Sequence, residues 1–279
     1  MKAPRIRHIL VAVDASPHSE AALEAAGELA ARFDAELLGL FVEDLNVLRL
    51  AGLPFTEELG LFSARRRRLS QRDVKRQLRI QARQAQETFA VVIERAGVAG
   101  EFHVVHGAVS REILKASQEA DIVLLGKVGM SKPQEGRLGS TARRLMAEAP
   151  GMTMILQDGA RLGAPVVLVY DGSPLAQKAL RAALTLLEDE AEPALTVLTT
   201  GGGVKTCRRL REEIEAELAG RPLPVRYRML SASTAEKVAY RIKMEERGTL
   251  VLPAKQTLLE NDVLLDLIAD LDVPVLLVR

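Results

Sequence analysis

The fold is decided by a stretch that occurs twice, first as ILVAVDASP at residues 9–17 and again as VVLVYDGSP at residues 166–174. Asp, Ser and Pro match at one constant offset between the two copies. Each copy predicts a buried strand, a short turn, and a helix with Ser as its N-cap and Pro in its first turn. The simplest account is two copies of one domain joined near Asp158, with a first domain at 1–158 and a second at 159–279.

Composition fits this account. A length of 279 residues corresponds to about two domains of roughly 150 residues each. The hydrophobic share of 48% and the charged share of 27% are ordinary for globular proteins, which excludes disordered and collagen-like chains. Lys and Arg exceed Asp and Glu by a net charge of +1, so no bulk positive field favours nucleic acid or a membrane as a partner.

The number of cysteines and the first residues of the chain indicate the cellular compartment. The single Cys207 cannot form an internal disulfide or a cluster of thiolate metal ligands. The basic start, residues 1–8, continues into the apolar stretch Ile9–Val13 and then Asp14. This stretch is too short for a signal peptide or a membrane span, so we expect a cytoplasmic protein.

Strand patterns alternate with helix patterns along the chain, which predicts an α/β fold with a parallel sheet covered on both faces. The strand patterns lie at Ile9–Val13, Leu37–Val42, Phe102–Val105, Ile122–Leu125, Thr153–Leu156, Pro165–Tyr170, Ala194–Leu198, Val225–Met229, Thr249–Leu252 and Val275–Val278. In the first half, helices are expected at Pro17–Phe33, from about Ser63 to Ala96, at Ser110–Glu119 and at Ser140–Glu148. In such sheets a ligand binds beyond the carboxyl ends of the strands, where Asp14 and Gly126 lie.

The stretch Leu45–Ser70 interrupts this alternation and contains four consecutive arginines, Arg65–Arg68. One interpretation is an exposed loop followed by the solvated face of a helix. The other is a lid or a partner-docking segment that uses the arginines. The sequence does not choose between them.

The motif with chemical content is Gly126-Lys127-Val128-Gly129, nine further residues, and then Gly139-Ser140-Thr141. Glycines at the end of a strand let the backbone turn sharply and approach a ligand closely. The Gly-Ser-Thr segment then places amide hydrogens and hydroxyls at a helix N-terminus, which favours an anion such as phosphate. The motif is not a P-loop, because no Gly-Lys-Ser/Thr follows four residues after a glycine. It is not the dinucleotide fingerprint either, because the glycines follow the fourth strand and Asp14, not glycine, ends the first.

An Asp that ends strand one, combined with Gly-x2-Gly-x9-Gly-Ser after strand four, resembles the ATP-binding branch of the universal stress protein family. The resemblance covers both halves, and the motif is intact in the first. It implies that Asp14 holds the ribose, that Val42 lines the adenine pocket, and that Ala12 and Lys127 lie nearby. It further implies that phosphates and ribose are wrapped by a set of backbone and hydroxyl groups from Gly126, Gly129, Gly139, Ser140 and Thr141.

The family resemblance also implies the architecture. It predicts two tandem domains of the flavodoxin-like or adenine nucleotide alpha hydrolase-like kind, arranged as an internal pseudo-dimer. Domains of this family pair through their final strands, which would here bring Met152–Gln157 and Pro274–Arg279 together.

The second half departs from the family pattern. Pro253 takes the position of Gly126, Gln256 takes that of Gly129, and the following loop at 257–262 is short and has no Gly-Ser. Proline removes a backbone donor, and side chains fill the space that a phosphate needs. Asp171 is retained, but we expect a degenerate domain kept for packing, with a different ligand as the alternative.

The remaining residues indicate no catalytic or metal site. His103 and His106 are three apart in a strand and face opposite ways, so they cannot chelate a metal together. We therefore expect a stress-response protein that binds ATP, with Mg²⁺ as an optional companion, and that acts through ligand-dependent conformation or a protein partner, which could be a second copy. ATP hydrolysis is expected to be slow at most. The alternative is a scaffold or regulatory protein that works without a nucleotide.

Overall fold

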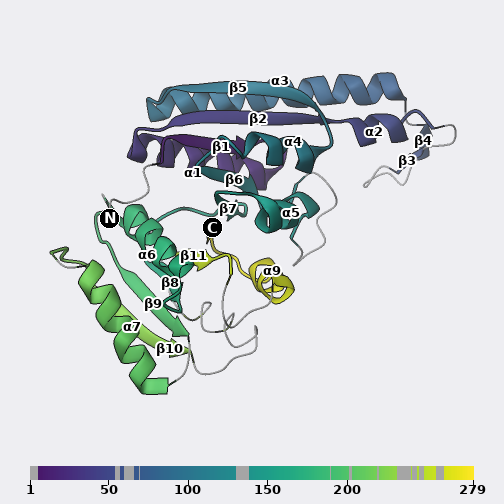
Figure 1. Cartoon of the computed structure of the whole chain (residues 1–279). Helices are drawn as coiled ribbons and strands as arrows, with labels where there is room; N and C mark the ends of the chain where they lie inside the picture. Colours follow the sequence, from purple (N-terminus) through teal and green to yellow (C-terminus); the bar gives the residue numbers. More distant parts are fainter. Residues whose placement is uncertain are drawn as a thin grey trace.

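The computed structural model describes residues 6–53, 57–59, 66–68, 70–129, 138–188, 190–200, 203–218, 220–230, 240, 244, 248–255 and 261–279. Its strands are β1 (His8–Ala12), β2 (Glu36–Asp44), β3 (Glu57–Leu59), β4 (Arg66–Arg68), β5 (Gly100–Gly107), β6 (Ile122–Gly126), β7 (Met152–Leu156), β8 (Val166–Tyr170), β9 (Leu195–Thr200), β10 (Val225–Leu230), β11 (Thr249–Pro253) and β12 (Val275–Val278). Its helices are α1 (Pro17–Phe33), α2 (Leu45–Leu50), α3 (Gln71–Ala96), α4 (Val109–Ala116), α5 (Ser140–Glu148), α6 (Pro174–Leu187), α7 (Gly203–Glu217) and α9 (Asn261–Ala269). Figure 1 shows them as an α/β fold built along one extended sheet.

Within the described residues, ten strands form that sheet in the order β10-β9-β8-β11-β12-β7-β6-β1-β2-β5. Neighbouring strands are parallel except at the centre, where β12 and β7 run antiparallel. At this junction Leu276 lies opposite Met154. The predicted pairing of the final strands is confirmed.

The two sides of the central junction have the same strand order. Counted outward from the junction, one side reads β7-β6-β1-β2-β5 and the other reads β12-β11-β8-β9-β10. In each half the chain starts at the middle strand and continues outward to the edge of the sheet. It then returns to form the two strands nearest the junction, so the order reverses between β1 and β6 and again between β8 and β11. The first of these switch points is where the sequence places Asp14 and Gly126.

Helices cover both faces of the sheet, as the alternating pattern predicts. The core on one face includes residues of α1, α3, α6 and α7, and the core on the other includes residues of α4, α5 and α9. Local caps fix the first helix of each half. The Ser16 side chain accepts a hydrogen bond from the Ser19 amide, and the Ser173 side chain accepts one from the Ala176 amide.

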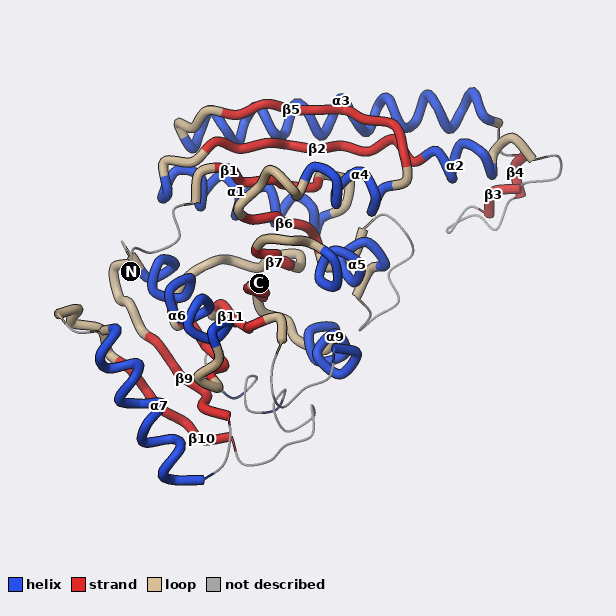
Figure 2. The backbone as a smooth tube through the Cα atoms, viewed as in Figure 1, coloured by secondary structure: helices blue, strands red, loops and turns tan. Residues whose placement is uncertain are grey.

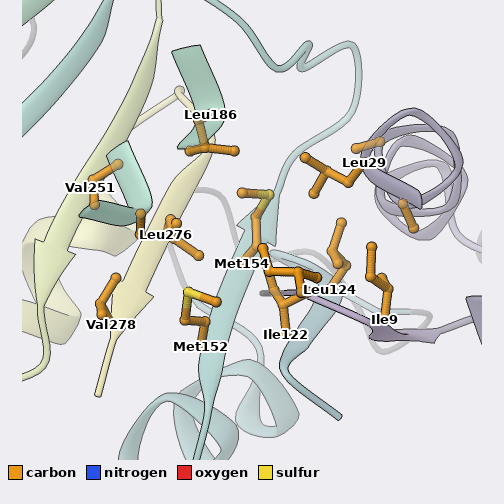
Figure 3. Close-up of a cluster of buried hydrophobic side chains, with 14 of the residues drawn as sticks. Ile9, Leu29, Ile122, Leu124, Met152, Met154, Leu186, Val251, Leu276 and Val278 are labelled. Atoms are coloured by element: carbon orange, nitrogen blue, oxygen red, sulfur yellow. The ribbon is translucent and has the colours of Figure 1, made fainter. Parts of the chain in front are cut away.

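The hydrophobic core runs through the antiparallel junction. Figure 3 shows Met152 and Met154 of β7 beside Leu276 and Val278 of β12. All four side chains are buried, the most accessible being Met152 at 8%. Each such side chain contributes about 1.5–3 kcal/mol by leaving water, so the two halves of the sheet are joined by shared core as well as by backbone hydrogen bonds.

The segment before α3 differs from the prediction. The helix expected from about Ser63 begins instead at Gln71, because the side chain of Ser70 accepts a hydrogen bond from the Arg72 amide and caps it. Arg66–Arg68 is strand β4, paired with β3. Part of the expected exposed loop is helix α2, capped by the Asp44 carboxylate, which accepts a hydrogen bond from the Asn46 amide.

Candidate functional site

The candidate site lies where the strand order reverses, at the carboxyl ends of β1 and β6. These strands are direct parallel neighbours, with Val11 opposite Leu124. Asp14 comes two residues after the end of β1, and Gly126 is the last residue of β6. Both predicted residues therefore lie at the edge where open α/β sheets bind ligands.

The Asp14 carboxylate is held by the turn that leads into α1. Its Oδ1 accepts a hydrogen bond from the Ser16 amide at 2.9 Å. The backbone of Asp14 is fixed as well, because its amide donates to Ser19 Oγ at 2.8 Å and its carbonyl accepts from the same hydroxyl at 3.0 Å. The carboxylate is thus oriented by the fold before any ligand binds.

Two glycines of the motif are required by close contacts. A Cβ on Gly126 would lie 2.8 Å from the Cβ of His18, so glycine lets β6 end against the start of α1. A Cβ on Gly129 would lie 2.7 Å from Asp14 Oδ2. The turn after β6 therefore passes directly over the Asp14 carboxylate.

The third glycine joins this turn to α5. The Gly139 amide donates to the Lys127 carbonyl at 2.9 Å, and Gly139 is the N-cap of α5. Having no side chain, Gly139 supplies no side-chain cap, and Ser140 and Thr141 form the first turn of the helix. Amides of an uncapped first turn are the usual donors to a bound anion. Residues 130–137 of the motif lie outside the described residues.

An apolar surface borders the same edge. Val42, which the family resemblance places at the adenine, and Ala12, which it places nearby, are partly buried against the core on the α4 and α5 face. Val105 and Val109 pack against the same core, and Val105 lies opposite Val42 in the β2–β5 register. Sequence reasoning missed these two valines, because nothing local fixes the register of β5 against β2.

Lys127 contributes its backbone to this site and its side chain to another contact. The side chain is buried, and its Nζ donates to the Leu271 carbonyl at 2.7 Å, in the second half of the chain. Its amide donates to Leu156 and its carbonyl accepts from Gly139. The main chain of Lys127 therefore lies with the glycine motif, whereas its side chain lies against the second half.

The second half repeats the aspartate turn, in which the carboxylate after the first strand accepts a hydrogen bond from the amide of the serine N-cap. Asp171 Oδ1 accepts from the Ser173 amide at 2.9 Å, as Asp14 does from Ser16. Pro253 lies opposite Val278 in β12, just as Gly126 lies opposite Leu156 in β7. Gln256 and residues 257–260 lie outside the described residues.

Burial of Tyr170, which precedes Asp171, raises the pKa of its hydroxyl to about 12, with smaller contributions from the nearby carboxylates. The phenol therefore stays neutral at ordinary pH.

The other candidate residues lie apart from this edge or form their own pairs. His103 Nε2 lies 3.1 Å from Glu101 Oε2, and His106 Nδ1 lies 3.0 Å from Glu43 Oε2. Among the residues that the structure describes, no group of three or more His, Cys, Asp or Glu could hold a metal ion. In the same part of the chain, no helix has both the length and the apolar character needed to span a membrane.

A second surface of distinct charge lies on α3. Five cationic residues share one exposed face of its N-terminal half: Arg72, Lys75, Arg76, Arg79 and Arg83. Together with Gln71 and Ile80 they line a hollow of about 690 Å³. Within the described residues, Arg83 is the member of this basic stripe that forms an ion pair, with Glu87.

The counterpart of α3 in the second half, α7, is arranged differently. Its Arg209 and Arg211 pair with Glu213 and Glu215 four residues on. The basic stripe is therefore a property of the first half.

Comparisons with known proteins agree with the fold. A universal stress protein from Archaeoglobus fulgidus DSM 4304 is 21% identical and superposes with a TM-score of 0.73, covering 98% of this chain and 96% of its own. Two Pseudomonas aeruginosa structures also cover 98% of this chain. One is a functionally unknown protein, PA1789 of strain PAO1 (14% identity, 92% of its own chain, TM-score 0.63), and the other a putative universal stress protein of strain UCBPP-PA14 (15%, 93%, 0.60). No curated protein matches in a sequence search. The sequence model of the universal stress protein family matches residues 5–157 of this chain. With that match over more than half of its length, the chain belongs to the universal stress protein family.

Proposed function

We propose that this protein binds one adenine nucleotide, ATP, at the carboxyl ends of β1, β2 and β6. One observation carries the proposal: the turn through Gly129 passes over Asp14 so closely that a Cβ would lie 2.7 Å from the carboxylate. Residues far apart in sequence thereby meet at the switch point of the sheet. The family resemblance supplies the ligand class.

Each group then has a role that its chemistry supports. The fixed Asp14 carboxylate accepts hydrogen bonds from the ribose hydroxyls. The partly buried Ala12 and Val42, joined by Val105, offer an apolar surface to the adenine. The phosphates lie against the amides and hydroxyls that the uncapped first turn of α5 presents at Ser140 and Thr141, with Gly126, Gly129 and Gly139 leaving the space.

We assign residues 1–158 to the binding domain and residues 159–279 to a degenerate copy. Support for the second assignment comes from Pro253, which is buried in β11 at the register position of Gly126. Asp171 alone does not make a nucleotide site. The second domain covers the edge of the first and occupies the place of a partner subunit.

The proposed output is a conformational state read by other molecules rather than fast turnover. ATP supplies a polyanion that bridges the two sides of the switch point, and Mg²⁺ would accompany the phosphates without a dedicated set of protein ligands. No general base or metal-ligating pair of carboxylates stands beside the glycine motif in the sequence, so we expect any hydrolysis to be slow. We place this activity in the cytoplasm as part of a stress response.

A charge placed at Gly139 tests the site without unfolding it. Its backbone angles, φ −58° and ψ 150°, suit any residue, and aspartate is a favourable N-cap. The added Cβ would lie 3.3 Å from the Lys127 carbonyl, a tight contact that a small shift relieves, so Gly139→Asp should keep the fold. Its carboxylate should repel the phosphates and abolish binding of ATP in calorimetric titration. Gly52→Asp adds the same charge at an exposed glycine after α2 and should bind as the wild type does. If Gly139→Asp binds ATP with unchanged affinity, the site is elsewhere.

The basic stripe on α3 favours a second candidate function, the docking of an acidic protein segment. Arg72, Arg76, Arg79 and Arg83 are spaced by three or four residues and extend over about 16 Å of helix. A partner with carboxylates at helical spacing would match them.

An oligoglutamate peptide with a fluorescent label serves as the probe for this docking surface. The double variant Arg76→Glu, Arg79→Glu should abolish a salt-sensitive rise in anisotropy. Arg208→Glu, Arg209→Glu on α7 should not. If both double variants lose the rise in anisotropy equally, the peptide responds only to net charge, and the docking site is rejected.

A further inference from the structure

The second half of the chain contacts the proposed phosphate-binding helix at both ends. Figure 2 shows α5 and α9 next to each other, to the right of β7. Near the start of α5, Arg143 lies 3.6 Å from Asp266 of α9. At its end, Arg279 Nη2 donates to the carbonyls of Met146 and, at 2.6 Å, Ala147. The C-terminal arginine therefore caps a helix that belongs to the first half.

The most buried of these contacts is made by a residue of the glycine motif. Lys127, between Gly126 and Gly129, is 7% exposed and donates through Nζ to the Leu271 carbonyl at 2.7 Å. Asp272 lies 3.7 Å away with a side chain that is 90% exposed, so it contributes little to the binding of the ammonium. A buried ammonium is unfavourable unless it is hydrogen-bonded, so this lysine ties its loop to the second half.

The same residue sets the position of the motif. The Lys127 amide donates to Leu156 at 2.6 Å, and its carbonyl accepts from the Gly139 amide at 2.9 Å. A displacement of the Lys127 side chain therefore moves the turn over Asp14 and the N-cap of α5 together. Arg143 is also bonded both to Gly139 and to the second half, because its amide donates to the Gly139 carbonyl at 2.9 Å, but its ion pair with Asp266 is exposed, whereas the Lys127 side chain is buried.

We propose that Lys127 is a positioning residue through which the second half of the chain regulates nucleotide affinity in the first. The degenerate half thus acts as an effector within the same chain. Any event that shifts the loop at Leu271 changes the phosphate cradle, which is the proposed phosphate site formed by Gly126, Gly129 and the start of α5. The inference rests on the proposed nucleotide site and adds its regulation. By linkage, a bound nucleotide must in turn stabilise the loop at Leu271.

The chain offers a matched control at the same interface between the halves. Arg32, in the last turn of α1, donates to the Leu186 carbonyl and to Glu190 Oε1, both at 2.7 Å. It joins the halves as Lys127 does, but it lies about 21 Å along α1 from His18, which contacts Gly126. Loss of Arg32 therefore weakens the interface without reaching the cradle.

The first experiment compares full-length Lys127→Met and Arg32→Met by thermal unfolding and by calorimetric titration with ATP. Both variants should lower the Tm. Lys127→Met should bind ATP at least about fivefold more weakly, the lower end of typical coupling between sites, whereas Arg32→Met should remain within about twofold of the wild type. Lys127→Arg, which keeps a cation and donor, should recover part of the affinity. Equal affinities in the two methionine variants overturn the proposal.

The second experiment needs no nucleotide. It also provides a replacement variant in case Lys127→Met does not fold. Amide hydrogen exchange of the free protein reports the bonds at Lys127 and Gly139 directly. Lys127→Met, or Lys127→Gln in its place, should speed exchange at Gly139 at least about fivefold, whereas Arg32→Met should leave it unchanged. If the wild type binds no ATP but this pattern holds, the proposed function fails and the coupling stands. Unchanged exchange at Gly139 in both variants rejects the coupling itself.

Discussion

The aspartate turn that occurs in both halves permits a controlled test of the binding site. Asp14→Ala and Asp171→Ala remove equivalent carboxylates, and each carboxylate accepts a hydrogen bond from the amide of a serine N-cap at 2.9 Å. Both residues are partly buried. The two variants should therefore lose similar stability, about 1.5–3 kcal/mol for a hydrogen bond to a charged group.

Their effects on ATP affinity should differ. If Asp14 accepts hydrogen bonds from the ribose, its loss should weaken binding by about 1.5–3 kcal/mol, or roughly 10- to 150-fold. Asp171→Ala should leave the affinity within about twofold, since only the first half keeps the glycine motif. The contrast between the variants separates a binding role from a structural one.

Calorimetric titration with ATP and with 2′-deoxy-ATP measures both effects, and urea unfolding supplies the matching stabilities. The wild type should prefer ATP over the deoxy form, and Asp14→Ala should lose most of this preference. If Asp14→Ala discriminates as the wild type does, or if Asp171→Ala loses as much affinity, Asp14 does not hold the ribose.

Two further predictions follow from contacts in the structure. Gly129→Ala places a Cβ 2.7 Å from Asp14 Oδ2 and should weaken ATP binding by displacing the carboxylate. Gly52→Ala places its Cβ against the flexible end of Gln71 and 3.3 Å from the Arg49 carbonyl, away from the site, and should bind ATP normally in the same titration. Burial raises the pKa of Tyr170 to about 12, so the stability that its neutral form supplies is complete below about pH 10 and is lost as the pH rises towards 12. Urea unfolding of Tyr170→Phe across this range should show a smaller decline in stability than the wild type, and an identical decline would exclude Tyr170 as its source.

Sequence reasoning was most successful where local chemistry decides the structure. The start of α1 follows from Ser16 and Pro17, and the same signals recur at Ser173 and Pro174 at the start of α6. The start of α3 was wrong because the pattern before it looked helical, although Ser70 is followed three residues later by Asp73 and marks an N-terminus. Attention to that spacing would have corrected the boundary.

Contacts between distant segments set the limit of prediction. That Asp14 and Gly126 share an edge follows from the topology alone. That Val105 lies beside Val42 depends on the register of β5, an edge strand whose exposed residues do not specify it. The direction of the Lys127 side chain depends on Leu271, 144 residues away, which belongs to the other half. Neighbouring residues carry no signal for such a contact.

The number of nucleotides bound per chain tests the central claim most directly. Native mass spectrometry of the full-length protein with excess ATP counts the ligands on each chain. Because the duplication kept the aspartate turn in both halves but the glycine motif only in the first, the spectrum should saturate at one nucleotide per chain. Saturation at two nucleotides would show that the second half retains a site, and a chain that stays free of nucleotide would contradict the account as a whole.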